Sequence, residues 1–166
     1  MPRLSQFNGT EIFLDANILL YDFTAHPRFG ASCHKLIEKT ELGQLRSITS
    51  HWVITETVHK LMLLEACDHF HLDMHEAVNY LKKHPRSIQT LSQYRKALDL
   101  LIRLPNLIIL EVSHPIFFQS HQLISKYQLL SSDAIHVATC LAHGIKHIAT
   151  NDKDFKRVKG ITVWLP

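Results

Sequence analysis

The sequence predicts an α/β fold, built on a mostly parallel β-sheet that is covered by helices on both faces. Short apolar runs are best interpreted as buried strands, and they alternate along the chain with longer segments whose apolar residues recur at helical spacing. The 166 residues suffice for one domain with a sizeable core, and no repeat, low-complexity tract or linker divides them. We therefore expect a single domain over residues 1–166.

Five runs are expected to form strands, and Pro, Gly and Ser residues indicate where the helices between them begin and end. The expected strands span residues 11–14, 45–49, 107–110, 147–150 and 161–165. The first expected helices span residues 17–23 and residues 26–42, the latter with Pro27 in its first turn, and a third begins at a cap formed by Ser50. Most of residues 72–103 are expected to be helical with a break at Pro85, and a further helix spans residues 115–127. The last expected helix is capped by Ser131 or Ser132 and ends at Gly144.

Composition limits the classes of function. Apolar residues make up 46% and charged residues 20% of the chain, and the net charge of +3 permits a nucleic-acid partner without arguing strongly for one. No apolar run is long enough to span a membrane, and residues 1–10 lack a signal-peptide core, so we expect a soluble, cytoplasmic protein. Cys33, Cys67 and Cys140 lie far apart without a C-x-x-C motif, which favours free thiols.

Four acidic residues lie at comparable joints between the expected elements. Asp15 and Asp152 each follow a strand, Asp133 lies in the first turn of a helix, and Glu56 lies near the start of the helix that Ser50 caps. In a parallel sheet the carboxyl ends of the strands share one edge, and the helices that follow begin there. We therefore expect the four carboxylates to converge at that edge.

Each acid also has a purely structural interpretation. Asp15 could be a turn or N-cap residue, and Asp133 an ordinary acid in a first helical turn. Glu56 and Lys60 have the i, i+4 spacing of a surface ion pair worth a few tenths of a kcal/mol, about 0.3. Only the set of four, taken together, favours a functional site.

A cluster of carboxylates stays ionised only where a cation compensates it, because like charges raise one another's pKa. Ligand sets made only of oxygen suit Mg²⁺ or Mn²⁺ and not zinc. Such ions activate water and neutralise charge on a phosphoryl group, so the chemistry that fits is phosphodiester hydrolysis. No Gly-rich phosphate loop, G-x-S-x-G or H-E-x-x-H motif is present to indicate another class of enzyme.

The chain resembles the PIN-domain ribonucleases, and most closely the VapC-type toxins of prokaryotic toxin–antitoxin pairs. The matching segments, in the family's order, are Phe13-Leu14-Asp15-Ala16-Asn17, Ile54-Thr55-Glu56, Leu130-Ser131-Ser132-Asp133-Ala134-Ile135-His136-Val137-Ala138 and Thr150-Asn151-Asp152-Lys153-Asp154-Phe155. Each segment alone is weak evidence, but the ordered set is fairly specific and spans essentially the whole chain.

The resemblance implies a PIN-like three-layer sandwich with a five-stranded parallel sheet, and an endoribonuclease dependent on Mg²⁺ or Mn²⁺. By the match, Asp15 and Asp133 would be the principal metal ligands, and Glu56 and Asp152 would complete the cluster directly or through water. Asn17 and Thr150 match supporting positions that hydrogen-bond the acids. The resemblance also implies single-stranded RNA as substrate, a homodimer, and inhibition by a cognate antitoxin protein.

One departure from compact members of the family is a longer helical segment around residues 72–103, which leaves the dimer mode, the fit of an antitoxin and the RNA path open. This segment also holds the densest basic region, which is either a solvated face or a nucleic-acid surface. The basic residues are Lys82, Lys83, Arg86, Arg95, Lys96 and Arg103. A second basic run, nearer the acids, could contact phosphate and consists of Lys153, Lys156, Arg157 and Lys159.

Two further residues near the predicted site have structural interpretations that we favour. His136, one turn from Asp133, could touch substrate but fits a partly buried structural histidine. Asp154 could join the cluster but fits a loop residue. Two other functions use a similar fold: a PIN-fold RNA-binding or regulatory module without turnover, and a phospho-accepting receiver-like domain. The receiver needs an acceptor Asp after a middle strand, where this chain has Glu111-Val112.

Overall fold

The computed structural model describes all of residues 1–166 and contains the predicted parallel sheet. Its five strands are β1 (Glu11–Leu14), β2 (Arg46–Ser50), β3 (Leu107–Leu110), β4 (His147–Ala149) and β5 (Thr162–Trp164). All pairings are parallel, in the order β3-β2-β1-β4-β5. The chain builds outward from β1 through β2 to β3 and then continues with β4 on the other side of β1. The order therefore reverses between β1 and β4, which is where open α/β sheets bind their ligands.

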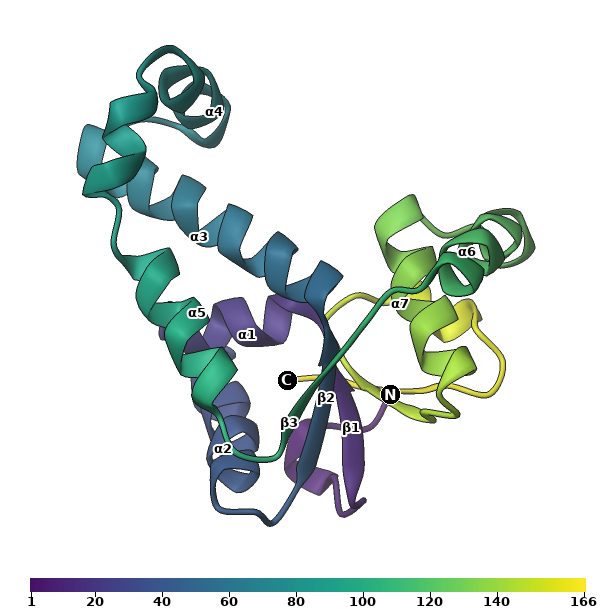
Figure 1. Cartoon of the computed structure of the whole chain (residues 1–166). Helices are drawn as coiled ribbons and strands as arrows, with labels where there is room; N and C mark the ends of the chain where they lie inside the picture. Colours follow the sequence, from purple (N-terminus) through teal and green to yellow (C-terminus); the bar gives the residue numbers. More distant parts are fainter.

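Helices cover the sheet on both sides and make a three-layer α/β sandwich (Figure 1). The α-helices are α1 (Ala16–Phe23), α2 (Gly30–Glu41), α3 (His51–Phe70), α4 (Met74–Lys83), α5 (Gln93–Arg103), α6 (His114–Tyr127) and α7 (Ser131–Ala142). Three short 3-10 helices are η1 (Leu4–Gln6), η2 (Pro85–Thr90) and η3 (Asp154–Arg157). Figure 1 places α1, α2 and α5 on one side of the sheet and α6 and α7 on the other.

The central strand β1 anchors the main core. Ile12, Phe13 and Leu14 are completely buried between the helical layers, as expected for a continuously apolar run in a parallel sheet. Strand β3, although the most apolar run, lies at the edge of the sheet and is only partly buried. The three cysteines are free thiols, as predicted. None of the helices combines the length and apolar character that a membrane span requires.

The longer helical segment predicted around residues 72–103 forms an extension from the sandwich. The 20-residue helix α3 runs out beyond the sheet, α4 lies at its far end, and α5 returns toward the sheet (Figure 1). Pro85 begins η2, so the predicted break in this segment is confirmed. The far end has a small core of its own, formed by Leu63, Ala66, Ala77, Leu81 and Leu91.

One predicted helix start and one predicted helix cap are wrong. Helix α2 begins at Gly30 and not at residue 26, because residues 26–29 form a turn in which His26 Nδ1 accepts the backbone N–H groups of Arg28 and Phe29 at 3.2 and 3.3 Å. Helix α7 begins at Ser131, but its N-cap is Leu130 and no side chain caps it. Ser131 and Ser132 were predicted as caps, but neither caps the helix; the Ser132 hydroxyl donates instead to Glu56.

Candidate metal-binding acid cluster

Asp15 lies directly after β1 and is the N-cap of α1. Its carboxylate is 6% exposed, and its Oδ1 atom accepts the backbone N–H of Ala16 at 2.7 Å. The structural interpretation of Asp15 as a cap is therefore correct, but it does not account for the second oxygen. Oδ2 accepts the Thr150 hydroxyl at 2.6 Å and the Asn17 side-chain amide. Burial raises the pKa of Asp15, while His136 and the hydrogen bonds from Thr150 and Ala16 oppose the rise.

Thr150 and Asn17 join β4 to the start of α1 across the point where the strand order reverses. Thr150, directly after β4, is fully buried, and its hydroxyl accepts the Asn17 amide at 2.9 Å and the Asp152 backbone N–H at 3.0 Å. Asn17 Oδ1 accepts the backbone N–H of Asn151 at 3.0 Å. Both residues therefore hold Asp15 in position, as the resemblance implied.

Asp133 lies in the first turn of α7 and is half-buried. Its pKa rises to about 6, first because burial disfavours the charged carboxylate and then because Asp152, Asp15 and Glu56 add negative charge nearby. His136 opposes the rise. The other three predicted acids all contribute to the pKa shift of Asp133, and we call Asp15, Glu56, Asp133 and Asp152 the acid cluster.

Glu56 forms the predicted surface ion pair with one carboxylate oxygen and faces the predicted site with the other. Its Oε1 atom pairs with Lys60 Nζ at 2.6 Å, the predicted i, i+4 ion pair. Its Oε2 atom accepts the Ser132 hydroxyl at 3.1 Å and lies 3.5 Å from His136 Nε2. The contact with His136, followed by the ion pair with Lys60, lowers the pKa of Glu56 to about 2 although burial opposes the shift. Glu56 is thus held in its ionised form.

Asp152 and Asp154 differ in what their side chains contact. The half-buried Asp152 carboxylate accepts the backbone N–H of Asp154 at 2.7 Å and adds to the charge that raises the pKa of Asp133. The Asp154 carboxylate pairs with the Arg157 guanidinium at 2.7 Å. Asp154 therefore stabilises η3, as its interpretation as a local structural residue predicted.

His136 is the residue that the sequence prediction left outside the site. It is 1% exposed, and its Nε2 atom lies 3.8 Å from Asp15 Oδ1 and 3.5 Å from Glu56 Oε2, between carboxylates carried by β1 and α3. Its Nδ1 atom is buried without a hydrogen-bond partner. The only sequence signal for this position is its i+3 spacing from Asp133, which places both on one helix face.

The donor set of the acid cluster fits a small divalent cation. Four carboxylates supply only oxygen ligands, and burial, followed by the negative charge of the other acids, raises the pKa of Asp133; a cation would compensate that charge. No group of three or more His, Cys, Asp or Glu side chains is arranged so that it could hold a metal ion by itself. Mg²⁺ is commonly bound by one or two carboxylates, with waters completing its octahedral shell. Asp15 and Asp133 could hold such an ion directly, with Glu56 and Asp152 acting on its waters.

Comparisons with known proteins agree with this fold. The model of the PIN domain family matches residues 12–161, and the chain belongs to this family. Ribonuclease VapC2 of Methanocaldococcus jannaschii is 32% identical over 159 residues, which cover 95% of each chain. Ribonuclease VapC6 of the same organism is 24% identical over 158 residues, 93% of this chain and 96% of that protein.

Solved structures share the fold. VapBC2 from Rickettsia felis, bound to a DNA fragment of its promoter, matches with a TM-score of 0.59 and 18% identity over 93% of this chain and 98% of that one. VapC20 of Mycobacterium tuberculosis, a toxin that cleaves the sarcin–ricin loop, matches with a TM-score of 0.59 and 17% identity over 90% and 96%. The PIN-like fold predicted from the sequence is therefore confirmed, whereas the roles of the individual acids stay predictions.

Proposed function

We propose that this chain is an endoribonuclease, dependent on Mg²⁺ or Mn²⁺, which hydrolyses RNA phosphodiester bonds at the acid cluster as one nuclease domain over residues 1–166. The observation that carries the proposal is that Asp15 and Glu56 lie 3.8 and 3.5 Å from His136 Nε2 at the reversal point of the sheet, where Asp133 and Asp152 add negative charge. Support also comes from the two VapC ribonuclease relatives, which match this chain over nearly its whole length.

The residues of the cluster would divide the work as follows. Asp15 and Asp133 bind the cation, and Thr150 and Asn17 fix the orientation of the Asp15 carboxylate by donating to its Oδ2 atom. Glu56 and Asp152 would orient a water and accept its proton. His136 stands between Asp15 and Glu56, so it keeps their oxygens apart and in place. When bound, the cation lowers the pKa of water and neutralises charge on the phosphoryl group.

The test is an RNA cleavage assay with single-stranded and structured substrates, comparing wild type with Asp15→Asn in Mg²⁺, Mn²⁺ or EDTA. We expect cutting by the wild type that is lost in EDTA and in the variant. Asp22→Asn, a change on the same helix outside the cluster, is the matched control and should cut like the wild type. Metal-independent RNA binding without cutting would instead favour the inactive module, and stable phosphorylation by a small phosphodonor would favour the receiver.

We further propose that the protein acts as the toxin of a toxin–antitoxin pair and forms a homodimer. The similarity to VapC and VapBC proteins supports the toxin–antitoxin pair, whereas the homodimer is carried over from the family resemblance alone. Expression of the wild type should arrest growth, whereas Asp15→Asn should not, and light scattering should report twice the 19.2 kDa mass of the chain. A monomer, or equal toxicity of the two proteins, would contradict the corresponding idea.

A further inference from the structure

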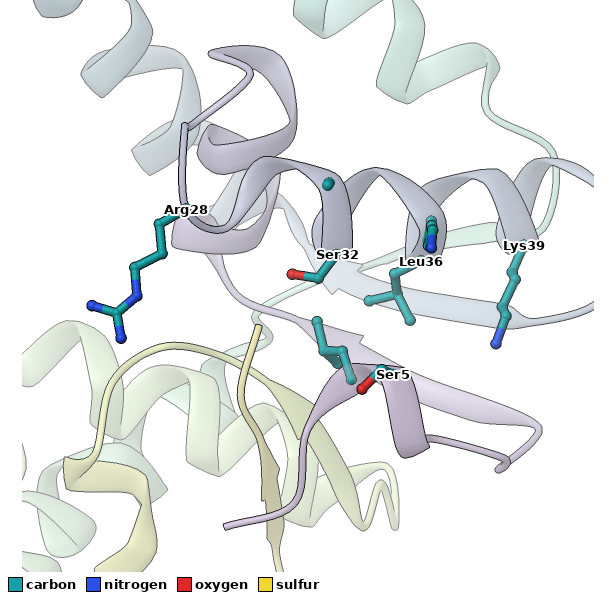
Figure 2. A pocket seen from close by; sticks show the side chains of 8 residues that line it. Ser5, Arg28, Ser32, Leu36 and Lys39 are labelled. Carbon is teal, nitrogen blue, oxygen red and sulfur yellow. The ribbon is translucent and has the colours of Figure 1, made fainter.

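A hollow in the surface lies between α2 and the N-terminal helix η1, and its lining includes no residue of the acid cluster. This hollow, of about 410 Å³, is lined by Arg28, Lys35 and Lys39, and no carboxylate lines it. Its remaining walls are Leu4, Ser5, Ala31, Ser32 and Leu36. Figure 2 shows Leu36 and Lys39 pointing from α2 to the side on which Ser5 lies, with Arg28 at the other end of the row. We call it the α2 hollow.

The three cations of the α2 hollow are not neutralised by the protein. The structure contains ion pairs at other residues, but none at Arg28, Lys35 or Lys39. Lys35 and Lys39 are four residues apart on one helix, where like charges destabilise each other by a few tenths of a kcal/mol, about 0.3. Leu4 and Leu36 beneath them are 4% and 3% exposed. Cations around a hollow with an apolar floor favour an anionic ligand.

The ligand should be an extended polyanion, because the cations are spread along the helix. Arg28 lies in the turn before α2, and Lys39 lies nine residues after Gly30, which corresponds to roughly 14 Å at the rise of an α-helix, so one phosphate group does not span the row. A neighbouring hollow of about 170 Å³ shares Lys39 and adds Asn8 and Gln44, so the polar surface continues along the same side. Successive phosphates of a nucleic-acid strand meet this requirement.

A chain of contacts connects the α2 hollow to the acid cluster. Asn151, the neighbour of Asp152, donates its side-chain amide to the Tyr21 hydroxyl at 3.0 Å. The Tyr21 ring packs against His26 and Phe29, with centroids 4.6 and 5.0 Å apart. The Arg28 guanidinium lies 5.1 Å from the centre of the Phe29 ring. Aromatic rings followed by unpaired cations are the combination that sequence-tolerant single-strand binding surfaces use.

We propose that the α2 hollow binds the backbone phosphates of the RNA strand whose scissile bond lies at the acid cluster, with the strand passing over the Tyr21, His26 and Phe29 rings. The inference rests on the proposed function in taking RNA as the ligand. It assigns the RNA path to α2, and not to the basic residues of the α4–α5 extension. The contact chain to the acid cluster favours RNA over an acidic peptide.

The test measures binding of a fluorescein-labelled single-stranded RNA of roughly 16 nucleotides by anisotropy, in EDTA, so that cleavage plays no part. Lys35→Gln/Lys39→Gln should weaken binding about tenfold at low salt and reduce the slope of log K against log salt by about 1.4, because two phosphate contacts are lost. The matched control is Lys82→Gln/Lys83→Gln in α4, which removes the same charge and should bind like the wild type. Both α2 side chains are exposed, and thermal melting will verify that the variants fold.

The length of the RNA probe distinguishes binding along a specific path from general electrostatic attraction to the protein. The effect of Lys35→Gln/Lys39→Gln should be smaller for a tetranucleotide than for the longer strand, because a short strand has fewer phosphates to place along a path from the acid cluster to α2. The inference is overturned if the α2 pair binds the longer RNA like the wild type, if the α4 control loses as much, or if RNA does not bind. Binding that depends on α2 in a protein that never cuts RNA would retain this inference and reject the proposed nuclease.

Discussion

Buried carboxylates occur in two regions of this molecule, and their surroundings differ. In the extension, Glu65 is 8% exposed, and its two oxygens accept the backbone N–H groups of Ser92 and Gln93 at 2.7 and 2.9 Å. In the acid cluster, the pKa of Asp133 is set by burial and by neighbouring charges, and no hydrogen-bond donor lowers it. One carboxylate is supplied with donors by the fold, whereas the other is surrounded by charges of its own sign.

The difference separates a structural acid from a functional one. Glu65 ties the start of α5 to the middle of α3, which is all that its contacts require. Placing the half-buried Asp133 among other acids costs folding free energy that His136 offsets only in part. Residues of this second kind, with perturbed pKa values and a common location, are the ones expected at sites of chemistry.

The strongest test of this contrast is Asp133→Asn. We expect cleavage to fall by more than about 100-fold, the upper range seen when residues that merely support a metal site are lost. The free energy of unfolding without metal should stay equal or rise, because one repelling charge disappears. The measurements are cleavage rates in Mg²⁺ and urea unfolding in EDTA. Full activity in this variant would remove Asp133 from the site.

The opposite outcome is expected for Glu65→Ala in the extension. Loss of the carboxylate leaves the Ser92 and Gln93 backbone donors without partners, which should lower the free energy of unfolding by about 2 kcal/mol. The cleavage rate per folded molecule should not change. Glu65→Gln, which retains one acceptor oxygen, should recover part of the stability in the same urea titration. A variant as stable as the wild type would show that these hydrogen bonds contribute little.

Glu56→Gln should have a smaller effect, because Glu56 has contacts of both kinds. We expect cleavage to fall about tenfold, a typical loss for a supporting residue of a metal site, and stability to change by less than about 1 kcal/mol. Lys60→Gln removes the same ion pair but leaves the carboxylate facing Ser132 and His136. Equal activity losses in the two variants would mean that the ion pair, and not the carboxylate at the cluster, accounts for the effect.

The sequence was informative wherever a residue follows a buried strand. Asp15 and Asp152 could be assigned to one edge because a continuous apolar run such as Ile12–Phe13–Leu14 is typical of a parallel strand, whereas Thr150 was expected inside its strand and was named only through the family resemblance. The strand order could not be predicted from the strand patterns alone. It depends on whether β4, which follows α7, pairs with β1 or with the opposite edge of the sheet. His136 was left out for the same reason: helical spacing gives its face but not that this face meets Glu56 of α3.

Local sequence signals failed where a tertiary contact or a turn competed with them. Pro27 suggested a first helical turn, but the His26 ring accepts two backbone N–H groups there and delays α2 to Gly30. Ser132 suggested a helix cap, but its hydroxyl donates to Glu56 on another helix. The α2 hollow was also hidden, because it requires η1 to lie opposite the Lys35 and Lys39 face of α2.

The smallest expected effect is the dependence of stability on pH, and it bears directly on the contrast between the two regions. The pKa of Asp133 is raised to about 6 in the folded protein, so its favourable contribution is complete below the unfolded value of 3.8 and is lost as the pH rises through about 6. Allowing for solvent screening, metal-free wild type should lose on the order of 1 kcal/mol relative to Asp133→Asn between about pH 5 and 7. The lowered pKa of Glu56, about 2, acts in the opposite sense but below this range. Parallel urea-unfolding profiles of the two proteins in EDTA would show that the acid cluster costs the fold nothing, and that Asp133 is a structural acid like Glu65.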